Sequence, residues 1–256
     1  DTVTVEEKAP STADSFNYQT EGNTIWFGGQ IPKGTVVKER ASIWDGVRYS
    51  AFLFTEMCEN EGITVTGEAA NILDVSPEQD ATPELLLVHQ SVPMQEICTV
   101  INQVSHNFYA DQVLRTLGER YGEEGSFSAG VKVVRDWMRS RQLPYPNVFQ
   151  MVDGSGLSTD NRFTPEQATS LYRLIHREPR LRESFVGTLK PQEYSFGVVK
   201  AKSGYIGGVR TLGGYLELKS GETIVFSFLC NQFSTSAREV STTNDAMLET
   251  IARELQ

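Results

Sequence analysis

One change in the period of the hydrophobic pattern constrains the fold more than any other feature of the sequence. In the middle of the chain, apolar residues recur at helical spacing, and helices are predicted at Met94–Val104, Phe108–Leu117, Ser128–Arg141 and Thr164–His176. Three consecutive strands are then predicted at Tyr194–Tyr205, Val209–Leu218 and Thr223–Phe233. A helix with apolar residues from Ala246 to Leu255 closes the chain. Helices followed by an antiparallel meander and a packing helix are typical of an α+β domain.

The first part of the chain has weaker signals. Residues 1–22 are polar and are expected to form a loose N-terminal segment. Asn23–Ile31 and Thr35–Ile43 are rich in β-forming residues and are separated by the turn sequence Pro32-Lys33-Gly34, so they predict a hairpin. The chain opens on Asp1 rather than on methionine, and we expect it to be a processed or cut product.

The segment that follows combines one helix with two short irregular stretches. Asp45 is the expected N-cap of a helix that ends before Gly62. Residues 69–84 contain several Asn, Asp, Pro and Glu residues and are predicted to form a surface loop. Leu85–Val88 is a run of four apolar residues and is predicted to be a short buried strand.

The charge balance excludes one broad class of partner. Lys plus Arg number 23 against 33 Asp plus Glu, a formal net charge of −10, so the sequence predicts no nucleic-acid binding. The longest apolar stretches fall far short of the roughly 18 residues that a membrane span needs. Apolar residues make up 39% of the 256, as in ordinary globular proteins. Cys58, Cys98 and Cys230 are expected to be buried free thiols.

Several kinds of catalytic or metal site are missing from the sequence. It has no C-x-x-C, H-E-x-x-H or P-loop motif, and its three histidines are scattered, so no metal and no cofactor are predicted. The segment Asp153–Ser158 resembles a nucleophile elbow, but that motif needs glycine where Asp153 stands. A triad built on histidine is therefore not expected.

Two short polar clusters remain as candidates for chemistry. Ser105-His106-Asn107 lies between two predicted helices, and Lys202-Ser203-Gly204 lies at the end of a predicted strand. Lys200 precedes the second cluster by two residues and so shares a strand face with Lys202. Each cluster alone also has a structural explanation, because Ser105 can cap the next helix and Lys-Ser-Gly can form a turn.

Taken in order and with their flanking residues, the clusters resemble sequence blocks of the peptidase S13 family. Its members are the class C penicillin-binding proteins, which are D-alanyl-D-alanine carboxypeptidases and endopeptidases. Ser105–Arg115 is similar to the S-x-N block, and Asp153–Ser158 to the D-G-S-G-L-S block. Lys200–Tyr205 is similar to the K-T-G block, with Ser203 in place of threonine. The likeness covers residues 23–255.

The resemblance implies a fold and a division of the chain. The fold would be the penicillin-binding or β-lactamase-like transpeptidase fold, an antiparallel sheet flanked by helices. Residues 1–42 would be the remnant of an accessory insertion domain, and residues 43–256 the C-terminal part of the penicillin-binding catalytic domain.

One departure from the family pattern concerns the nucleophile. The family's nucleophilic serine lies in an S-x-x-K motif, but no serine of this chain is followed by lysine three residues later. We therefore expect the nucleophile and its lysine to lie outside this chain, and the chain alone to be inactive. The fold is expected to be incomplete at its N-terminus, without the family's first two strands.

The implied activity is that of a serine-type D-Ala-D-Ala carboxypeptidase or endopeptidase that forms an acyl-serine intermediate. A lysine base suits a chain whose histidines are scattered. Ser105 would relay a proton to the leaving amine, Asn107 would hold the substrate peptide bond, and Lys202 would supply positive potential for the terminal carboxylate. His106 is the variable middle residue of its motif and is given no role.

Three further residues are expected to bind the substrate. Ser203 would offer its hydroxyl to the carboxylate, Gly204 would allow close approach of the backbone, and the Tyr205 N–H would contribute to an oxyanion hole. Asp153 and Ser155 are expected to stabilise a turn rather than take part in catalysis.

Partners and location follow from the same resemblance. The substrates would be peptidoglycan peptides that end in D-alanyl-D-alanine, and the complete protein would bind β-lactams. The expected location is the periplasm or cell envelope, and the expected protein partner is an N-terminal segment of the same protein or a second copy of the chain. Two alternatives stay open at this point: a non-catalytic peptidoglycan-binding relative, and an unrelated α+β interaction domain with chance motifs.

Overall fold

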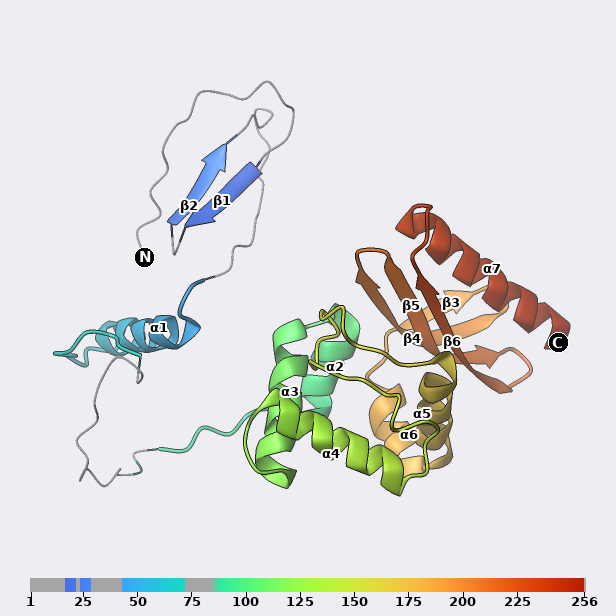
Figure 1. The fold of residues 1–256 in the computed structure, drawn as a ribbon, viewed down its shortest axis with the longest axis horizontal. Helices are drawn as coiled ribbons and strands as arrows, with labels where there is room; N and C mark the ends of the chain where they lie inside the picture. Colours follow the sequence, from blue (N-terminus) through green and yellow to red (C-terminus); the bar gives the residue numbers. More distant parts are fainter. Residues whose placement is uncertain (1–16, 22–23, 29–42, 72–84, 86, 256) are drawn as a thin grey trace. The chain divides into compact units, whose positions relative to one another are not determined.

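A computed structural model describes residues 17–21, 24–28, 43–71, 85 and 87–255. The chain divides into two compact units, Asp1–Val88 and His89–Gln256 (Figure 1). From the sequence we expected a boundary after residue 42, between the remnant of an accessory insertion domain and the catalytic domain. That boundary describes the origin of the two segments within the family and not compact units, and it stays a prediction.

Among its described residues, the first unit contains two paired strands and one helix. Strands β1 (Asn17–Glu21) and β2 (Thr24–Gly28) pair antiparallel. The expectation of a loose segment up to residue 22 is therefore wrong for β1. Gly22 and Asn23, which separate the two strands, are residue types that favour tight hairpin turns, and this signal outweighs the polar composition. The expected second strand, Thr35–Ile43, lies outside the described residues except for its last residue.

The helix of the first unit, α1 (Gly46–Asn60), confirms the prediction. The Asp45 carboxylate caps it by accepting a hydrogen bond from the Arg48 N–H at 3.1 Å, and the helix ends before Gly62. The predicted strand at Leu85–Val88 is wrong. Leu85, Leu87 and Val88 are not in a strand and are 79%, 74% and 68% exposed. Most of the predicted loop at residues 69–84 lies outside the described residues.

The second unit begins with five helices among the described residues: α2 (Met94–Val104), α3 (Asn107–Tyr121), α4 (Phe127–Ser140), α5 (Pro165–Arg177) and α6 (Pro179–Val186). Four of them were predicted. The fifth, α6, was missed because it is only eight residues long and follows α5 almost directly.

Gly118 shows why the predicted end of α3 is wrong. The helix continues through this glycine to Tyr121, and the glycine serves packing instead. A side chain at Gly118 would place its Cβ 2.8 Å from the Gly130 nitrogen on α4. The absence of a side chain therefore lets α3 and α4 approach closely.

The sheet of the second unit has the strand order β3-β4-β5-β6, and all its pairs are antiparallel. The strands are β3 (Pro191–Tyr194), β4 (Gly197–Ile206), β5 (Val209–Leu218) and β6 (Thr223–Asn231), and helix α7 (Ala237–Leu255) follows. The predicted strand at Tyr194–Tyr205 is in fact divided between β3 and β4 by a turn at residues 195–196. The meander itself was predicted.

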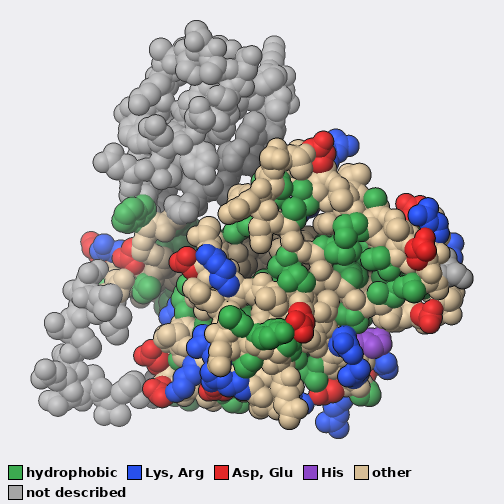
Figure 2. Space-filling model, turned by 45° about the vertical axis from the view of Figure 1, so that its right-hand side comes forward, with side chains coloured by type: hydrophobic (Ala, Val, Ile, Leu, Met, Phe, Trp, Pro, Cys, Tyr) green, Lys and Arg blue, Asp and Glu red, His purple; other side chains and the backbone are tan. Residues whose placement is uncertain are grey.

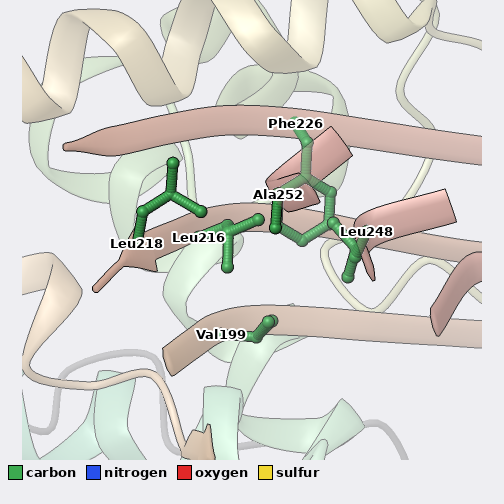
Figure 3. Close-up of a cluster of buried hydrophobic side chains, with 6 residues drawn as sticks. All are labelled: Val199, Leu216, Leu218, Phe226, Leu248 and Ala252. Carbon is green, nitrogen blue, oxygen red and sulfur yellow. The ribbon is translucent and has the colours of Figure 1, made fainter. Parts of the chain in front are cut away.

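Helices cover both faces of this sheet, so its alternate side chains enter two different environments. On one face a buried cluster joins the sheet to α7; its members are Val199, Leu216, Leu218, Phe226, Leu248 and Ala252 (Figure 3). On the other face the Tyr215 hydroxyl donates a hydrogen bond to the Tyr172 carbonyl of α5 at 2.9 Å. The α+β class and the antiparallel sheet flanked by helices are confirmed.

Cys58, Cys98 and Cys230 are free thiols, as expected, but all three are partly exposed rather than buried. Within the part of the chain that the structure describes, no helix has the length and apolar character to cross a bilayer.

β6 is an edge of the sheet, since no strand among the described residues pairs with it on the side away from β5. Its sequence is largely apolar, from Ile224 to Leu229. Figure 2 shows apolar side chains, in green, on the surface of the molecule. Val104, Phe108 and Tyr121 are 67%, 63% and 76% exposed. Such edges and surfaces favour association with another chain.

The 256-residue chain made alone is therefore expected to associate into dimers or larger assemblies. Light scattering should give a mass above the 28.5 kDa of one chain. A monomer that unfolds cooperatively would show that the edge is covered from within the chain, and that our expectation of missing strands is wrong.

Candidate active site

Lys202 and Ser105 meet in the folded chain although 97 residues separate them. The Lys202 ammonium donates a hydrogen bond to the Ser105 hydroxyl oxygen and a second one, at 2.7 Å, to the carbonyl of Ser203. Both residues and Ser203 line one cleft of about 500 Å³. We expected four motif residues to converge on one cleft: Ser105, Asn107, Lys202 and Ser203. Three of them line it, and Asn107 is not among the lining residues.

The local backbone explains how Ser105 reaches this position. It lies just after α2 in the left-handed conformation, with φ 55° and ψ 53°. The capping role expected of Ser105 is wrong, because His106 caps α3 by accepting a hydrogen bond from the Tyr109 N–H at 3.3 Å. His106, which had been given no role, therefore leaves the Ser105 hydroxyl available to Lys202.

Asn107 is placed less decisively than the other motif residues. It is the first residue of α3 and is exposed, two positions from Ser105. It is not among the residues that line the cleft with Ser105 and Lys202. Its assignment as a catalytic residue stays a prediction.

The two lysines of the K-x-K stretch have different surroundings. Lys200 forms an ion pair with Glu217 at 2.8 Å, which fixes its side chain on the sheet. Lys202 forms no ion pair among the described residues, and burial lowers the pKa of its ammonium from the ordinary value. Lys202, rather than Lys200, is therefore the cation available to a ligand.

The strand that carries Lys202 is paired on one side only at this point. β3 pairs with Gly197–Lys200 of β4, and no described strand pairs with Ala201–Ile206 on that side. Backbone N–H and C=O groups of this stretch are thus open to an extended ligand.

Each of the three predicted substrate-binding residues lies on this open stretch. Ser203 is exposed and lines the cleft, and Tyr205 is 58% exposed. Gly204 lies opposite Thr211, and a Cβ at Gly204 would come 2.5 Å from the Thr211 hydroxyl oxygen. A side chain at position 204 would therefore displace the Thr211 hydroxyl, while the binding roles stay predictions.

The D-G-S-G-L-S segment is a compact loop that Asp153 stabilises. The Asp153 carboxylate accepts hydrogen bonds from the Gly156 and Ser158 N–H groups, at 2.8 and 2.6 Å. Its expected turn-stabilising role is confirmed. A second carboxylate, Asp111 of α3, accepts hydrogen bonds from the Gly154 and Ser155 N–H groups at 2.9 and 2.8 Å. Asp111 thus anchors the loop to the helix that begins at the S-x-N motif.

The cleft has a polar wall that the sequence analysis did not single out. It is lined by Tyr194, Arg210, Ser241, Asn244 and Asp245. The Tyr194 hydroxyl donates to the Asp245 carboxylate at 2.9 Å; burial, followed by this contact, raises the Tyr194 pKa to about 12. One signal was present: Asn244 lies four residues from both Val240 and Leu248, inside the apolar stripe of α7.

Metal chemistry finds no support in the side chains of this site. Across the described residues, no group of three or more His, Cys, Asp and Glu side chains is arranged to hold a metal ion.

Comparison with known proteins now decides the family. The chain matches the D-Ala-D-Ala carboxypeptidase 3 (S13) family over residues 2–254. It belongs to the S13 peptidases. The alternative of an unrelated α+β interaction domain is therefore excluded.

Two curated S13 relatives illustrate the similarity and its extent. The chain is 26% identical over 232 residues to the D-alanyl-D-alanine carboxypeptidase of Actinomadura sp. (strain R39). It is 28% identical over 208 residues to the D-alanyl-D-alanine carboxypeptidase DacB of Haemophilus influenzae. The matches cover 84% and 76% of this chain but only 42% of each relative, so the chain spans less than half of their length.

A solved structure supports the fold. Penicillin-binding protein 4 (dacB) of Haemophilus influenzae, crystallised with a β-lactam, matches with a TM-score of 0.69 and 21% identity, over 93% of this chain and 57% of that one. The penicillin-binding fold inferred from the sequence is thereby confirmed.

The anchoring role of Asp111 can be measured as stability. Asp111→Ala removes the acceptor of two part-buried backbone N–H groups, so we expect a loss of about 1–3 kcal/mol in the free energy of unfolding. Asp160→Ala, at an exposed position of the same loop, is the matched control and should change stability by less than about 0.5 kcal/mol. Equal urea midpoints for the two variants would contradict the anchor.

The environment of Lys202 predicts a pH effect with a definite sign. Because folding lowers the Lys202 pKa, the folded chain releases this proton at lower pH than the unfolded chain, and stability rises with pH between the lowered pKa and 10.5. Side-chain NMR of the folded and urea-unfolded chain should show the lower titration midpoint in the folded state. Lys202→Met should abolish the rise in stability. A Lys202 midpoint equal to that of the unfolded chain would contradict the lowered pKa.

Proposed function

We propose that this chain is part of a serine-type D-Ala-D-Ala carboxypeptidase or endopeptidase that acts on peptidoglycan stem peptides through an acyl-serine intermediate. The observation that carries the proposal is the contact between Lys202 and Ser105 in one cleft of an S13 chain. It unites the S-x-N and K-T-G-like motifs, which are far apart in the sequence.

The direction of this hydrogen bond suits Ser105 to proton transfer. Lys202 donates to the Ser105 oxygen, so the hydroxyl proton of Ser105 points elsewhere and is available to another acceptor. During acyl transfer the C–N bond of the substrate breaks, and the departing amine needs a proton. As the nucleophilic serine forms the new C–O bond, its lysine takes the serine proton, and Ser105 relays a proton from that lysine to the amine, so Lys202 keeps its charge.

The unpaired edge of β4 binds the C-terminus of the substrate. The Lys202 charge and the Ser203 hydroxyl bind the terminal carboxylate, which a net charge of −10 would otherwise repel. The Tyr205 N–H lies on the same open stretch and serves the oxyanion hole. Asn107 holds the amide of the peptide bond from the start of α3.

The nucleophilic serine and its lysine are proposed to lie outside these 256 residues. No serine here is followed by lysine three residues later, and the chain spans less than half of its curated relatives. On this proposal residues 1–42 come from an accessory insertion domain, and residues 43–256 form the C-terminal part of the catalytic domain. An N-terminal segment of the same protein, or a second copy, then covers the β6 edge.

Substrate and location follow from the activity. Peptidoglycan peptides ending in D-alanyl-D-alanine are the proposed substrates, and β-lactams are proposed ligands of the complete protein, as in the crystal structure of the Haemophilus relative. The proposed location is the periplasm or cell envelope. The missing S-x-x-K favours one second candidate, a peptidoglycan-binding relative that kept the carboxylate grip without catalysis. An S-x-x-K encoded upstream of Asp1 would decide for the enzyme.

A labelling experiment tests where the nucleophile lies. The 256-residue chain incubated with benzylpenicillin is expected to show no stable covalent adduct, because no serine has the required lysine. Intact-mass spectrometry is the measurement, with an S13 peptidase that contains S-x-x-K as the positive control. Stoichiometric labelling of the chain would show that it carries its own nucleophile.

A further inference from the structure

The cleft that holds Ser105 and Lys202 extends past β4 to helix α7. Ser241, Asn244 and Asp245 are spaced so that they share one face of that helix, and all three line the cleft. Arg210 of β5 joins this wall, because its Nε donates a hydrogen bond to the Ser241 hydroxyl at 3.1 Å. These residues take no part in the proposed acyl transfer.

Asn244 is the residue of this wall that most clearly lacks a partner. It is only 6% exposed, yet its side-chain amide forms no hydrogen bond with any described residue. Asn244 is one of the residues that line the cleft. No buried side-chain nitrogen or oxygen atom of the described residues lacks a hydrogen-bond partner, so the polar atoms of the Asn244 amide reach solvent, and a ligand in the cleft can replace that water.

The two charged groups of the wall keep spare hydrogen-bonding capacity. Arg210 uses one N–H on Ser241, and its guanidinium lies over the Tyr205 ring at 5.6 Å from the centroid. It forms no ion pair among the described residues, and its other N–H groups form no hydrogen bond with a described residue, so they can donate to a ligand. Asp245 accepts one hydrogen bond, from Tyr194, and its carboxylate has room for more. The wall thus offers donors and acceptors side by side.

We infer that this α7 wall binds the backbone of the substrate peptide, upstream of the terminus held by Lys202 and Ser203. A peptide backbone presents C=O acceptors and N–H donors alternately. Arg210 and the Asn244 amide nitrogen donate to its carbonyls, while the Asn244 amide oxygen and Asp245 accept from its N–H groups. The inference rests on the proposed function, because it assigns the second half of the same cleft.

Simple ions fit the wall less well. An inorganic anion attracted to Arg210 would also meet the Asp245 carboxylate, and a cation attracted to Asp245 would meet the guanidinium. A neutral group that both donates and accepts hydrogen bonds satisfies all of these side chains together.

Three N-acetylated peptides, whose only charge is the C-terminal carboxylate, test the inference by isothermal titration calorimetry with the 256-residue chain. The short ligand is acetyl-D-Ala-D-Ala, the long one is acetyl-Gly-Gly-Gly-D-Ala-D-Ala, and the third replaces the glycines by sarcosine, which lacks the N–H. The long peptide is expected to bind about five- to tenfold more tightly than the short one. The sarcosine peptide should lose most of this gain.

Two substitutions assign the gain to the wall. Asn244→Ala and Arg210→Gln should each reduce the benefit of the longer peptide and leave the affinity for acetyl-D-Ala-D-Ala unchanged. Asn231→Ala and Arg238→Gln, at exposed positions, are the matched controls and should change neither affinity. If Asn244→Ala fails to fold, the test is made with Arg210→Gln alone, because the Arg210 side chain is only partly buried.

The outcomes separate this inference from the proposed function. Equal affinity for the short and long peptides, or a gain that survives both substitutions, would overturn the role of the α7 wall. Loss of short-peptide binding in Lys202→Ala supports the proposed function whatever the wall does. If Asn244→Ala removes the gain in affinity but Lys202→Ala leaves short-peptide binding unchanged, the role of the α7 wall is supported. The proposed binding of the terminal carboxylate by Lys202 is then overturned. Binding of neither peptide would overturn both.

Discussion

The hydrogen bond from Lys202 to Ser105 depends on an unfavourable backbone conformation. Ser105 has φ 55°, in the left-handed region, where a residue with a Cβ is strained by about 1–2 kcal/mol. This conformation ends α2 and lets α3 begin two residues later, with His106 rather than Ser105 as its cap. Strain of this kind persists where the surroundings hold it, and it is concentrated at functional sites. Here it brings the S-x-N motif to the strand that carries Lys202.

The sheet contributes rigidity on one side of the site and openness on the other. β4 pairs with β5 along its whole length, and helices pack on both faces of the sheet, so the position of Lys202 is well fixed. β3 ends its pairing at Lys200, which leaves the next residues on a free edge. A fixed strand with an open edge is suited to hold a peptide, and the polar residues of α7 continue that surface.

Regular patterns in the sequence predicted most of the second unit. Helical spacing predicted α2, α4 and α5. The start of α5 was placed correctly, and in the structure Thr164 and Gln167 form a capping box there, a local interaction that needs no tertiary context. Features that depend on distant neighbours were missed. Leu85, Leu87 and Val88 are apolar but exposed, and Gly118 permits helix packing instead of ending a helix. Asn244 is recognised as a candidate binding residue only from its place in the cleft. The motif residues were found through a resemblance, and only the structure showed that Ser105 meets Lys202.

The central claim is that Ser105 and Lys202 act as one unit on a bound peptide terminus. A double-mutant cycle measures this directly, with the affinity for acetyl-D-Ala-D-Ala determined for the unaltered chain, Ser105→Ala, Lys202→Met and the double variant. Because the two side chains are in contact, the account predicts a coupling energy of about 0.5–3 kcal/mol. Effects that add within about 0.3 kcal/mol would mean that the two residues act independently, and would contradict the account.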